Sequence, residues 1–231
     1  MSEKKETYVY KRHDGRWEAR YTKGYTPDGK PIRGAVYGKN YDEVVERRRE
    51  LIGEADETRK IPTELNLLIL GAGSHGQNIK EIAETLHVFD KIRFLDDKAV
   101  GDEIIGKCND ATKFRNEYVC AFVALGDNKT RKKWTKFLKD RNFLIPNIIS
   151  TSATISPKAV LGKGLAIMPQ STINESVIGD YCILASNSLI NNGAVVGDYS
   201  RVDCGGIVLK GKKVPEGTWI KSGEIFGIDR N

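Results

Sequence analysis

The sequence predicts a multidomain chain: a small three-stranded antiparallel sheet with one helix, a small Rossmann-like α/β domain, and a parallel β-helix. The β-helix is predicted by an aliphatic residue that recurs every six positions, with one interval of five after Ile173. Helices repeat at 3.6 residues and strands at two, whereas each six-residue rung of a β-helix turns one aliphatic side chain into a narrow core. A strand, a glycine-rich loop and a helix in succession predict the α/β domain, and three strand-like runs before residue 40 predict the sheet. The recurring residues are Ile155, Leu161, Ile167, Ile173, Ile178, Leu184, Ile190, Val196, Val202, Val208, Val214 and Ile220.

Charge and composition restrict the class of protein. The 231 residues carry a formal net charge of +6, which favours an anionic partner. The four cysteines include no closely spaced pair, so we expect buried thiols in a reducing compartment and no metal site. The first residues are charged and no apolar run reaches about 18 residues, so we expect no signal peptide, no membrane span and a cytoplasmic protein.

Residues 1–53 are expected to form the sheet and its helix. Asp14-Gly15, typical of a hairpin turn, separates the first two strand-like runs, and a helix with an apolar side follows the third run. Alternation along the second strand directs Trp17 and Ala19 toward this helix. Residues 54–63 are charged and contain Pro62, which disfavours a continued helix, so we expect a linker there.

The opposite face of this sheet is predicted to bind DNA. Cations outnumber acids in this region, and guanidinium groups on a sheet can pair with phosphates and guanine edges in a major groove. A solvated charged face is the alternative that composition leaves open. The candidate DNA-binding residues are Lys11, Arg12, Arg16, Arg20, Lys23 and Arg33.

Three segments of the first domain carry a family resemblance. Tyr10-Lys-Arg-His-Asp-Gly-Arg-Trp-Glu-Ala-Arg-Tyr, Asp28-Gly-Lys-Pro-Ile and Val36-Tyr-Gly-Lys resemble the arm-site DNA-binding domain of tyrosine integrases, a domain related in fold to plant AP2 modules. The resemblance implies an AP2-like module whose three-stranded sheet lies in the major groove. It does not extend to an integrase catalytic domain, so recombination is not implied.

Residues 64–150 are predicted to bind a nucleotide. The apolar run at 67–70 leads into Gly71-Ala-Gly-Ser-His-Gly and then a helix, the context in which backbone N–H groups can approach a pyrophosphate. Asp96 and Asp97 end the next strand, about twenty residues beyond the loop, where an acid can bind a ribose hydroxyl. A dinucleotide site for NAD is an alternative, although few further elements follow to build its second half.

Residues 151–231 carry the repeats and a second family resemblance. Leu161-Gly-Lys-Gly, Ile178-Gly-Asp, Val196-Gly-Asp and Val214-Pro-Glu-Gly-Thr resemble the hexapeptide acyltransferases. With the preceding domain, residues 65–228 are similar to the bacterial nucleotide-sugar acetyltransferases of bacillosamine and sialic-acid-type sugar synthesis. The resemblance implies a left-handed β-helix, a homotrimer, acetyl-CoA as donor and a UDP-type nucleotide-linked amino sugar as acceptor. It places the nucleotide sugar on Gly71, Gly73, Ser74, His75, Gly76, Asp96, Asp97, Gly126 and Asn128.

The same resemblance implies a catalytic histidine that is absent here. Asn192 stands at the position of the general base and Asn191 at that of the acid that orients it. A carboxamide cannot take up a proton at neutral pH, and the loss of a positioned base typically costs about 10² to 10⁴ in rate. Two further family histidines align with Arg201 and Ser150, and about one eighteen-residue coil is missing before the closing motif.

Three functions remain open on these grounds. The first is a degenerate homologue that keeps a nucleotide-sugar site and binds DNA, with acyl transfer impaired or lost. The second is an active acetyl-CoA-dependent acetyltransferase in which His75, a water molecule or the amine of the substrate replaces the missing base. The third is a structural trimer without a small ligand. His75 itself is either a sugar contact or a loop side chain that caps the following helix.

Overall fold

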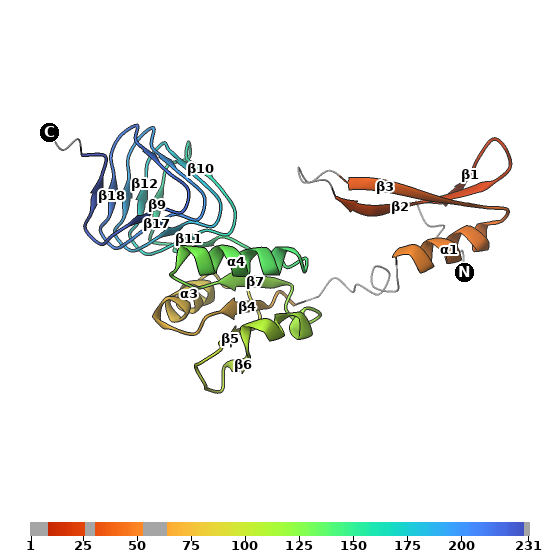
Figure 1. Ribbon diagram of the computed structural model, residues 1–231, viewed down its shortest axis with the longest axis horizontal. Coiled ribbons are helices and arrows are strands. Elements are labelled where there is room, and N and C mark those ends of the chain that lie inside the picture. The colour runs from red at the N-terminus through yellow and green to blue at the C-terminus, as the bar shows by residue number, and fades with distance from the viewer. Residues whose placement is uncertain (1–8, 26–30, 53–63, 229–231) are drawn as a thin grey trace. The chain divides into compact units, whose positions relative to one another are not determined.

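The computed structural model describes residues 9–25, 31–52 and 64–228, and the chain divides into two compact units, Met1–Thr63 and Glu64–Asn231 (Figure 1). The predicted turn at 26–30 and the predicted linker at 54–63 lie outside the described residues.

The first unit is an antiparallel sheet of order β1-β2-β3 with one helix, as the sequence predicts. Gly15 has a φ of +83° in the hairpin that joins the first two strands, a conformation that glycine adopts without steric cost. The elements are β1 Val9–Lys11, β2 Trp17–Tyr25, β3 Pro31–Gly38 and α1 Tyr41–Ile52.

The side of this sheet that carries Trp17 and Ala19 packs on α1. Ala19 and Val44 are fully buried, and the ring of Trp17 meets that of Tyr41 edge-on at 5.2 Å between centroids. The predicted alternation is therefore confirmed. Lys11 pairs with Trp17 across the strands and so lies on the helix side, not on the arginine-rich face with which it was grouped.

The second unit opens with a four-stranded parallel sheet of order β6-β5-β4-β7. All four residues of β4 are buried because helices and the solenoid enclose this central strand. The sequence pattern did not predict β6, which forms an edge of the sheet, or the short 3-10 helix η1 that follows it. The elements are β4 Leu67–Leu70, α3 Ser74–Thr85, β5 Ile92–Leu95, β6 Ile104–Gly106, η1 Cys108–Phe114, β7 Cys120–Val123 and α4 Asn128–Lys139.

Three parallel sheets of two-residue strands form the solenoid, whose coils are visible in Figure 1. Their orders are β20-β17-β14-β11-β8, β21-β18-β15-β12-β9 and β10-β13-β16-β19, consistent with a left-handed β-helix. The strands are β8 Ile148–Ile149, β9 Thr154–Ile155, β10 Val160–Leu161, β11 Ala166–Ile167, β12 Thr172–Ile173, β13 Val177–Ile178, β14 Ile183–Leu184, β15 Leu189–Ile190, β16 Val195–Val196, β17 Arg201–Val202, β18 Ile207–Val208, β19 Lys213–Val214, β20 Trp219–Ile220 and β21 Ile225–Phe226.

The predicted six-residue period is confirmed by burial. Every member of the aliphatic series from Ile167 onward is buried, and Ile155 and Leu161 in the first coil are partly buried. The interval of five arises at the corner between β12 and β13, which has three residues, 174–176, where the next corner has four, 179–182. From Tyr181 to Gly223 every sixth residue has a positive φ, which turns the chain from one sheet to the next.

The α/β sheet and the solenoid share one hydrophobic core. Ile79 of α3 and Phe94 of β5 belong to the same buried cluster as Ile148, Ala166 and Ile183 on the outside of the solenoid. The stack of coils already includes β8, which pairs with β11. A division of this unit between residues 150 and 151 stays a prediction.

Candidate functional site

The glycine-rich loop passes from β4 into α3 under tight steric limits. Gly71 has a φ of +103°, and a Cβ atom at Gly76 would overlap the carbonyl oxygen of Gly71, so both positions require glycine. Gly73, the N-cap of α3, has open space around it and makes no side-chain capping bond. The backbone N–H groups of the first helical turn therefore lack a side-chain cap, an arrangement in which a helix N-terminus can bind an anion.

Asp96 and Asp97 hold the backbone around this loop. Asp96 accepts backbone N–H bonds from Ala72, Lys98 and Ala99, each at 2.8 Å, and these bonds lower the pKa of its carboxyl group. Asp97 accepts the N–H of Cys108 at 3.0 Å. Both predicted ribose-binding acids thus hold the local backbone, and a ribose at Asp96 would have to share both of its carboxylate oxygens.

Arg131 joins α4 to the solenoid. Its guanidinium donates to the carbonyls of Tyr181 at 3.2 Å and Tyr199 at 2.6 Å, and also to the carbonyls of Leu125 and Gly126. The residue is only 3% exposed, and burial lowers its pKa to about 10. No carboxylate of the described residues forms an ion pair with Arg131, so backbone carbonyls and the side-chain oxygen of Asn128 hold its guanidinium.

Asn128 completes this junction. Its side-chain Nδ2 donates to the carbonyl of Gly217 at 2.9 Å, and its Oδ1 accepts from Arg131 at 2.9 Å. The amide predicted to bind a nucleotide sugar thus spans α4 and the solenoid. Gly126, another predicted ligand residue, lies against the guanidinium of Arg201, which a Cβ atom there would meet.

Between the glycine-rich loop and the solenoid lies a cluster of polar side chains. Arg201 donates to Asp203 at 2.9 Å, Trp219 donates to the same carboxylate at 3.2 Å, and the guanidinium of Arg201 lies 5.3 Å from the centre of the Trp219 ring. The Nε atom of Arg201 and the Nε2 atom of His75 are buried and have no hydrogen-bond partner among the described residues. A buried donor and a buried acceptor without partners are groups that a bound polar molecule could satisfy.

His75 is neutral in this setting. It lies in the first turn of α3, where burial first and then the charges of Arg201 and Arg131 lower its pKa to about 4. His75 lies inside α3 and not in the loop before it, and its Nε2 atom makes no hydrogen bond with the described residues, so a capping role stays a prediction. An uncharged imidazole can accept a hydrogen bond at neutral pH, whereas its low pKa makes His75 a weak proton acceptor.

The positions that align with family histidines are not brought together within one chain. Asn192 is exposed at the corner between β15 and β16, and the Nδ2 of Asn191 donates to the carbonyl of Val208 at 3.1 Å. Arg201 opens β17, whereas Ser150 follows β8 three strands away in the same sheet. Strands lie about 4.8 Å apart, so Ser150 and Arg201 are separated by roughly 14 Å.

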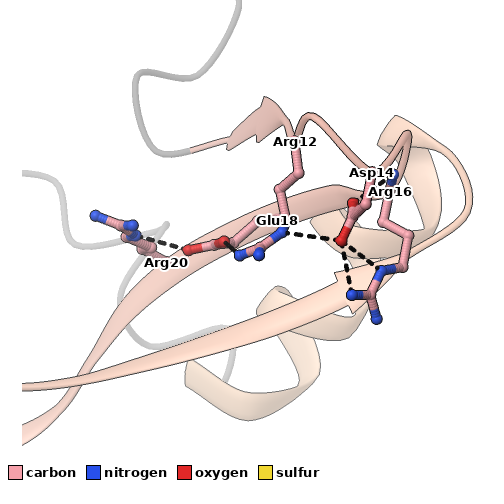
Figure 2. Close-up of polar contacts among 5 residues, drawn as sticks. All are labelled: Arg12, Asp14, Arg16, Glu18 and Arg20. Atoms are coloured by element: carbon pink, nitrogen blue, oxygen red, sulfur yellow. Dashed lines mark hydrogen bonds and ion pairs between the residues drawn. The ribbon is translucent and has the colours of Figure 1, made fainter.

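The predicted DNA-binding face of the first unit carries arginines and tyrosines. Arg12, Arg16 and Arg20 are exposed on it, and Figure 2 shows them alternating with Asp14 and Glu18. Register places Arg33 on the same face, because Arg33 pairs with Thr22 two residues after Arg20. The side chain of Lys23 lies outside what the structure describes.

Comparison with known proteins identifies one part of the chain. Residues 66–138 match the PglD N-terminal domain. This match contains the glycine-rich loop, the acids after β5 and nearly all of α4. An uncharacterized protein of Acanthamoeba polyphaga mimivirus is 32% identical over 125 residues, which are 52% of this chain and 25% of that protein. The chain thus spans about a quarter of the length of this curated relative.

Solved structures of sugar acetyltransferases share the fold. PerB from Caulobacter crescentus, in complex with CoA and GDP-perosamine, is 25% identical with a TM-score of 0.62, covering 71% of this chain and 89% of that one. A histidine-to-asparagine variant of the perosamine N-acetyltransferase from the same organism, with both ligands, is 24% identical with a TM-score of 0.62 and the same coverage. The acetyltransferase domain of PglB from Neisseria gonorrhoeae, with acetyl coenzyme A, is 23% identical with a TM-score of 0.61, covering 68% and 87%. Together with the match to the PglD N-terminal domain, the PerB structure supports an acetyltransferase-like function.

Several residues of the site escaped sequence analysis. Trp219 joins Arg201 because positions eighteen apart stack on neighbouring coils, a relation that the six-residue period itself implies, and Asp203 lies two residues after Arg201. No local pattern singles out Arg131, because its acceptors on the solenoid are the distant carbonyls of Tyr181 and Tyr199. Within the described ranges 9–25, 31–52 and 64–228, no cluster of three metal-ligating side chains occurs and no helix is long and apolar enough to cross a membrane.

Proposed function

We propose that residues 64–231 bind a nucleotide-linked amino sugar, that their capacity for acyl transfer is impaired or lost, and that residues 1–53 bind DNA. The chain in this account is a degenerate nucleotide-sugar acetyltransferase homologue with a left-handed solenoid, a Rossmann-like nucleotide domain and an AP2-like module. The observation that carries the catalytic part is Asn192, an exposed carboxamide where the family resemblance implies a histidine.

The surroundings of Asn192 support the loss of a proton acceptor. Asn191, at the position of the orienting acid, is bound to the carbonyl of Val208 along the coil. The sequence has three histidines, at positions 13, 75 and 87, so the solenoid has none. The Caulobacter variant with asparagine in place of a histidine was solved with CoA and GDP-perosamine, so in that enzyme such a replacement is compatible with both ligands.

The nucleotide sugar is proposed to lie between the glycine-rich loop and the solenoid. Its diphosphate would meet the first turn of α3 at Gly73 and Ser74, where the N–H groups lack a side-chain cap. Its sugar would meet the unpartnered Nε2 of His75 and Nε of Arg201. PglD-type sites of this kind are consistent with either a UDP-linked or a GDP-linked sugar, because the diphosphate contacts are common to both.

An acetyl-CoA assay tests the catalytic part. Release of CoA thiol should stay near background when the chain is mixed with acetyl-CoA and a UDP- or GDP-linked 4-amino sugar. Asn192→His should raise the rate, by up to about 10² to 10⁴ where the rest of the site is intact. Turnover by the unaltered chain at ordinary enzymatic rates of about 1 to 10³ per second would remove the proposal.

A working acetyltransferase that uses His75 is the second candidate. The observation that favours it is the neutral imidazole, whose Nε2 atom is free of partners in the part of the chain that the structure describes. Acetyl-CoA would then be the donor. His75→Gln should abolish turnover in this case, whereas Asn192→His should change it little.

The proposed oligomer is a homotrimer. Val160 and Val177 lie exposed side by side on the outer surface of β10 and β13, 59% and 41% accessible, which leaves an apolar strip for another subunit. Three DNA-binding modules on one trimer would bind a long duplex with avidity. Light scattering at several concentrations tests this, and a monomer throughout would contradict it.

A further inference from the structure

A row of five charged side chains runs along β2 and the β1–β2 hairpin on the sheet face opposite α1 (Figure 2). In order they are Arg20, Glu18, Arg12, Asp14 and Arg16, with ion pairs of 2.7 Å from Arg20 to Glu18, 2.7 Å from Glu18 to Arg12, 3.4 Å from Arg12 to Asp14 and 2.7 Å from Asp14 to Arg16. Three guanidiniums and two carboxylates sum to a charge of only +1. We call these five residues the charged row. It is not a uniformly cationic patch, because the carboxylates of Asp14 and Glu18 would repel a phosphate.

Glu18 is the centre of the row and the least accessible charge on the face. Its side chain is 3% exposed, covered by its neighbours on the same face, among them Tyr10 and Tyr37, which flank it on the adjacent strands. The Tyr10 hydroxyl and then Arg20 and Arg12 hydrogen-bond to the carboxylate and lower its pKa to about 2. The carboxylate therefore stays ionised at physiological pH and fixes both arginines.

The three arginines use different edges in these pairs. Arg12 engages Nη1 and Nε, and Arg16 engages Nε and Nη2, so each keeps one nitrogen outside the row. Arg20 meets Glu18 through Nε alone, which leaves both of its Nη groups clear of carboxylates in the described part of the chain. The Arg20 guanidinium also lies 5.2 Å from the centre of the Tyr10 ring, and its side chain is 59% exposed.

The two Nη groups of an arginine form a fork that matches O6 and N7 of guanine, whereas a single N–H suits a phosphate oxygen. Three strands about 4.8 Å apart span about 10 Å, which fits a major groove about 12 Å wide in B-form DNA. The major groove of A-form RNA is too narrow for side chains to read. The face therefore matches duplex DNA better than duplex RNA.

We propose that Arg20 reads a guanine in the major groove, that Glu18 is a positioning residue that aims the Arg20 fork, and that Arg12 and Arg16 contact phosphates. This inference rests on the proposed DNA binding by the first unit and assigns the residue that would supply its sequence preference. The two carboxylates of the charged row weaken its nonspecific attraction to DNA phosphates. They also hold the guanidinium groups in place, and a positioned guanidinium can distinguish one base from another.

The test uses the full chain and a pool of 30-base-pair DNA duplexes with a randomised centre, followed by sequencing of the bound fraction. The affinity for the best duplex is then compared with that for duplexes in which each guanine in turn is replaced by adenine. Wild type should prefer guanine at one position by about 10- to 100-fold. Arg20→Lys keeps the charge and loses the fork, so it should abolish this preference while retaining low-salt binding to unselected duplex.

Glu18→Gln and Asp14→Asn form a matched pair. Each removes one negative charge, so each should strengthen binding to unselected duplex and steepen its salt dependence. Only Glu18→Gln removes the carboxylate that holds Arg20 in position through its Nε atom. Only Glu18→Gln should therefore also reduce the guanine preference. A purely structural role for Glu18 would weaken both kinds of binding together. Arg20 is exposed, so Arg20→Lys decides the matter even where Glu18→Gln unfolds the unit.

The outcomes separate the two proposals. A guanine preference that survives in Arg20→Lys overturns the assignment of Arg20 and leaves DNA binding standing. The absence of binding to any duplex at 50 mM salt overturns both. Equal affinity for duplex RNA without base preference also overturns the assignment.

Discussion

Replacement of Arg131 by methionine should destabilise the second unit by about 4 kcal/mol. The guanidinium makes five hydrogen bonds, to the carbonyls of Leu125, Gly126, Tyr181 and Tyr199 and to the Asn128 side chain. Hydrogen bonds of a charged group are worth about 1.5 kcal/mol each at the low end, so the gross loss is about 7 kcal/mol. The fall of the Arg131 pKa from 12.5 to about 10 indicates a burial cost of about 3 kcal/mol, which methionine recovers.

Urea unfolding followed by tryptophan fluorescence measures this loss. The background should carry Trp17→Phe, so that Trp134 and Trp219 report on the second unit alone. Lys129→Met is the matched control, because Lys129 is exposed on the same helix and its removal should change stability by no more than about 0.5 kcal/mol. A loss below about 1 kcal/mol for Arg131→Met would refute the view that Arg131 holds α4 on the solenoid. Arg131→Lys should recover little, since an ammonium group cannot reach acceptors on both sides of the junction.

Three further predictions concern the loop and the titrating groups. Gly76→Ala should destabilise the second unit by about 1 to 3 kcal/mol, because its Cβ meets the Gly71 carbonyl, whereas Gly73→Ala has free space and should be near neutral; equal losses in urea unfolding would contradict this. The pKa of His75 is about 4 in the folded chain and about 6.5 in the unfolded chain, so on acidification the unfolded chain takes up the proton at the higher pH. The free energy of unfolding should therefore be unaffected by His75 above about pH 6.5 and fall by about 3 kcal/mol toward pH 4. His75→Gln should remove that part of the pH dependence. If the variant loses as much unfolding free energy as wild type between about pH 6.5 and pH 4, His75 is not its source. The depressed pKa of Glu18 stabilises the first unit above about pH 4.5, and this contribution should vanish as the pH approaches 2, with Glu18→Gln showing a flatter acid transition by circular dichroism.

The sequence determined those features whose cause is local. The six-residue series predicted the solenoid core correctly. Each rung contacts only the neighbouring rungs, so the aliphatic residue of each rung is buried whatever the distant parts of the chain do. The interval of five after Ile173 located a shortened corner for the same reason. Strand alternation predicted which side of the first sheet faces the helix. The loop from Gly71 to Gly76 was recognisable because the contact that requires glycine at position 76 is made with Gly71, only five residues away.

Only the tertiary structure decided what the polar side chains do. Asn128 and Arg131 lie within one helical turn in the sequence, but their acceptors on the solenoid are carbonyls fifty to ninety residues away, so their role depends on how α4 meets the solenoid. His75 of α3 and Arg201 of β17 become neighbours because the α/β sheet and its helices pack on the solenoid, which no spacing encodes. Glu18 lies on the face that alternation assigns to solvent, yet it is buried because long arginine and tyrosine side chains close over it. Local pattern sets the direction of a side chain, whereas its partners come from the assembly of elements that are distant along the chain.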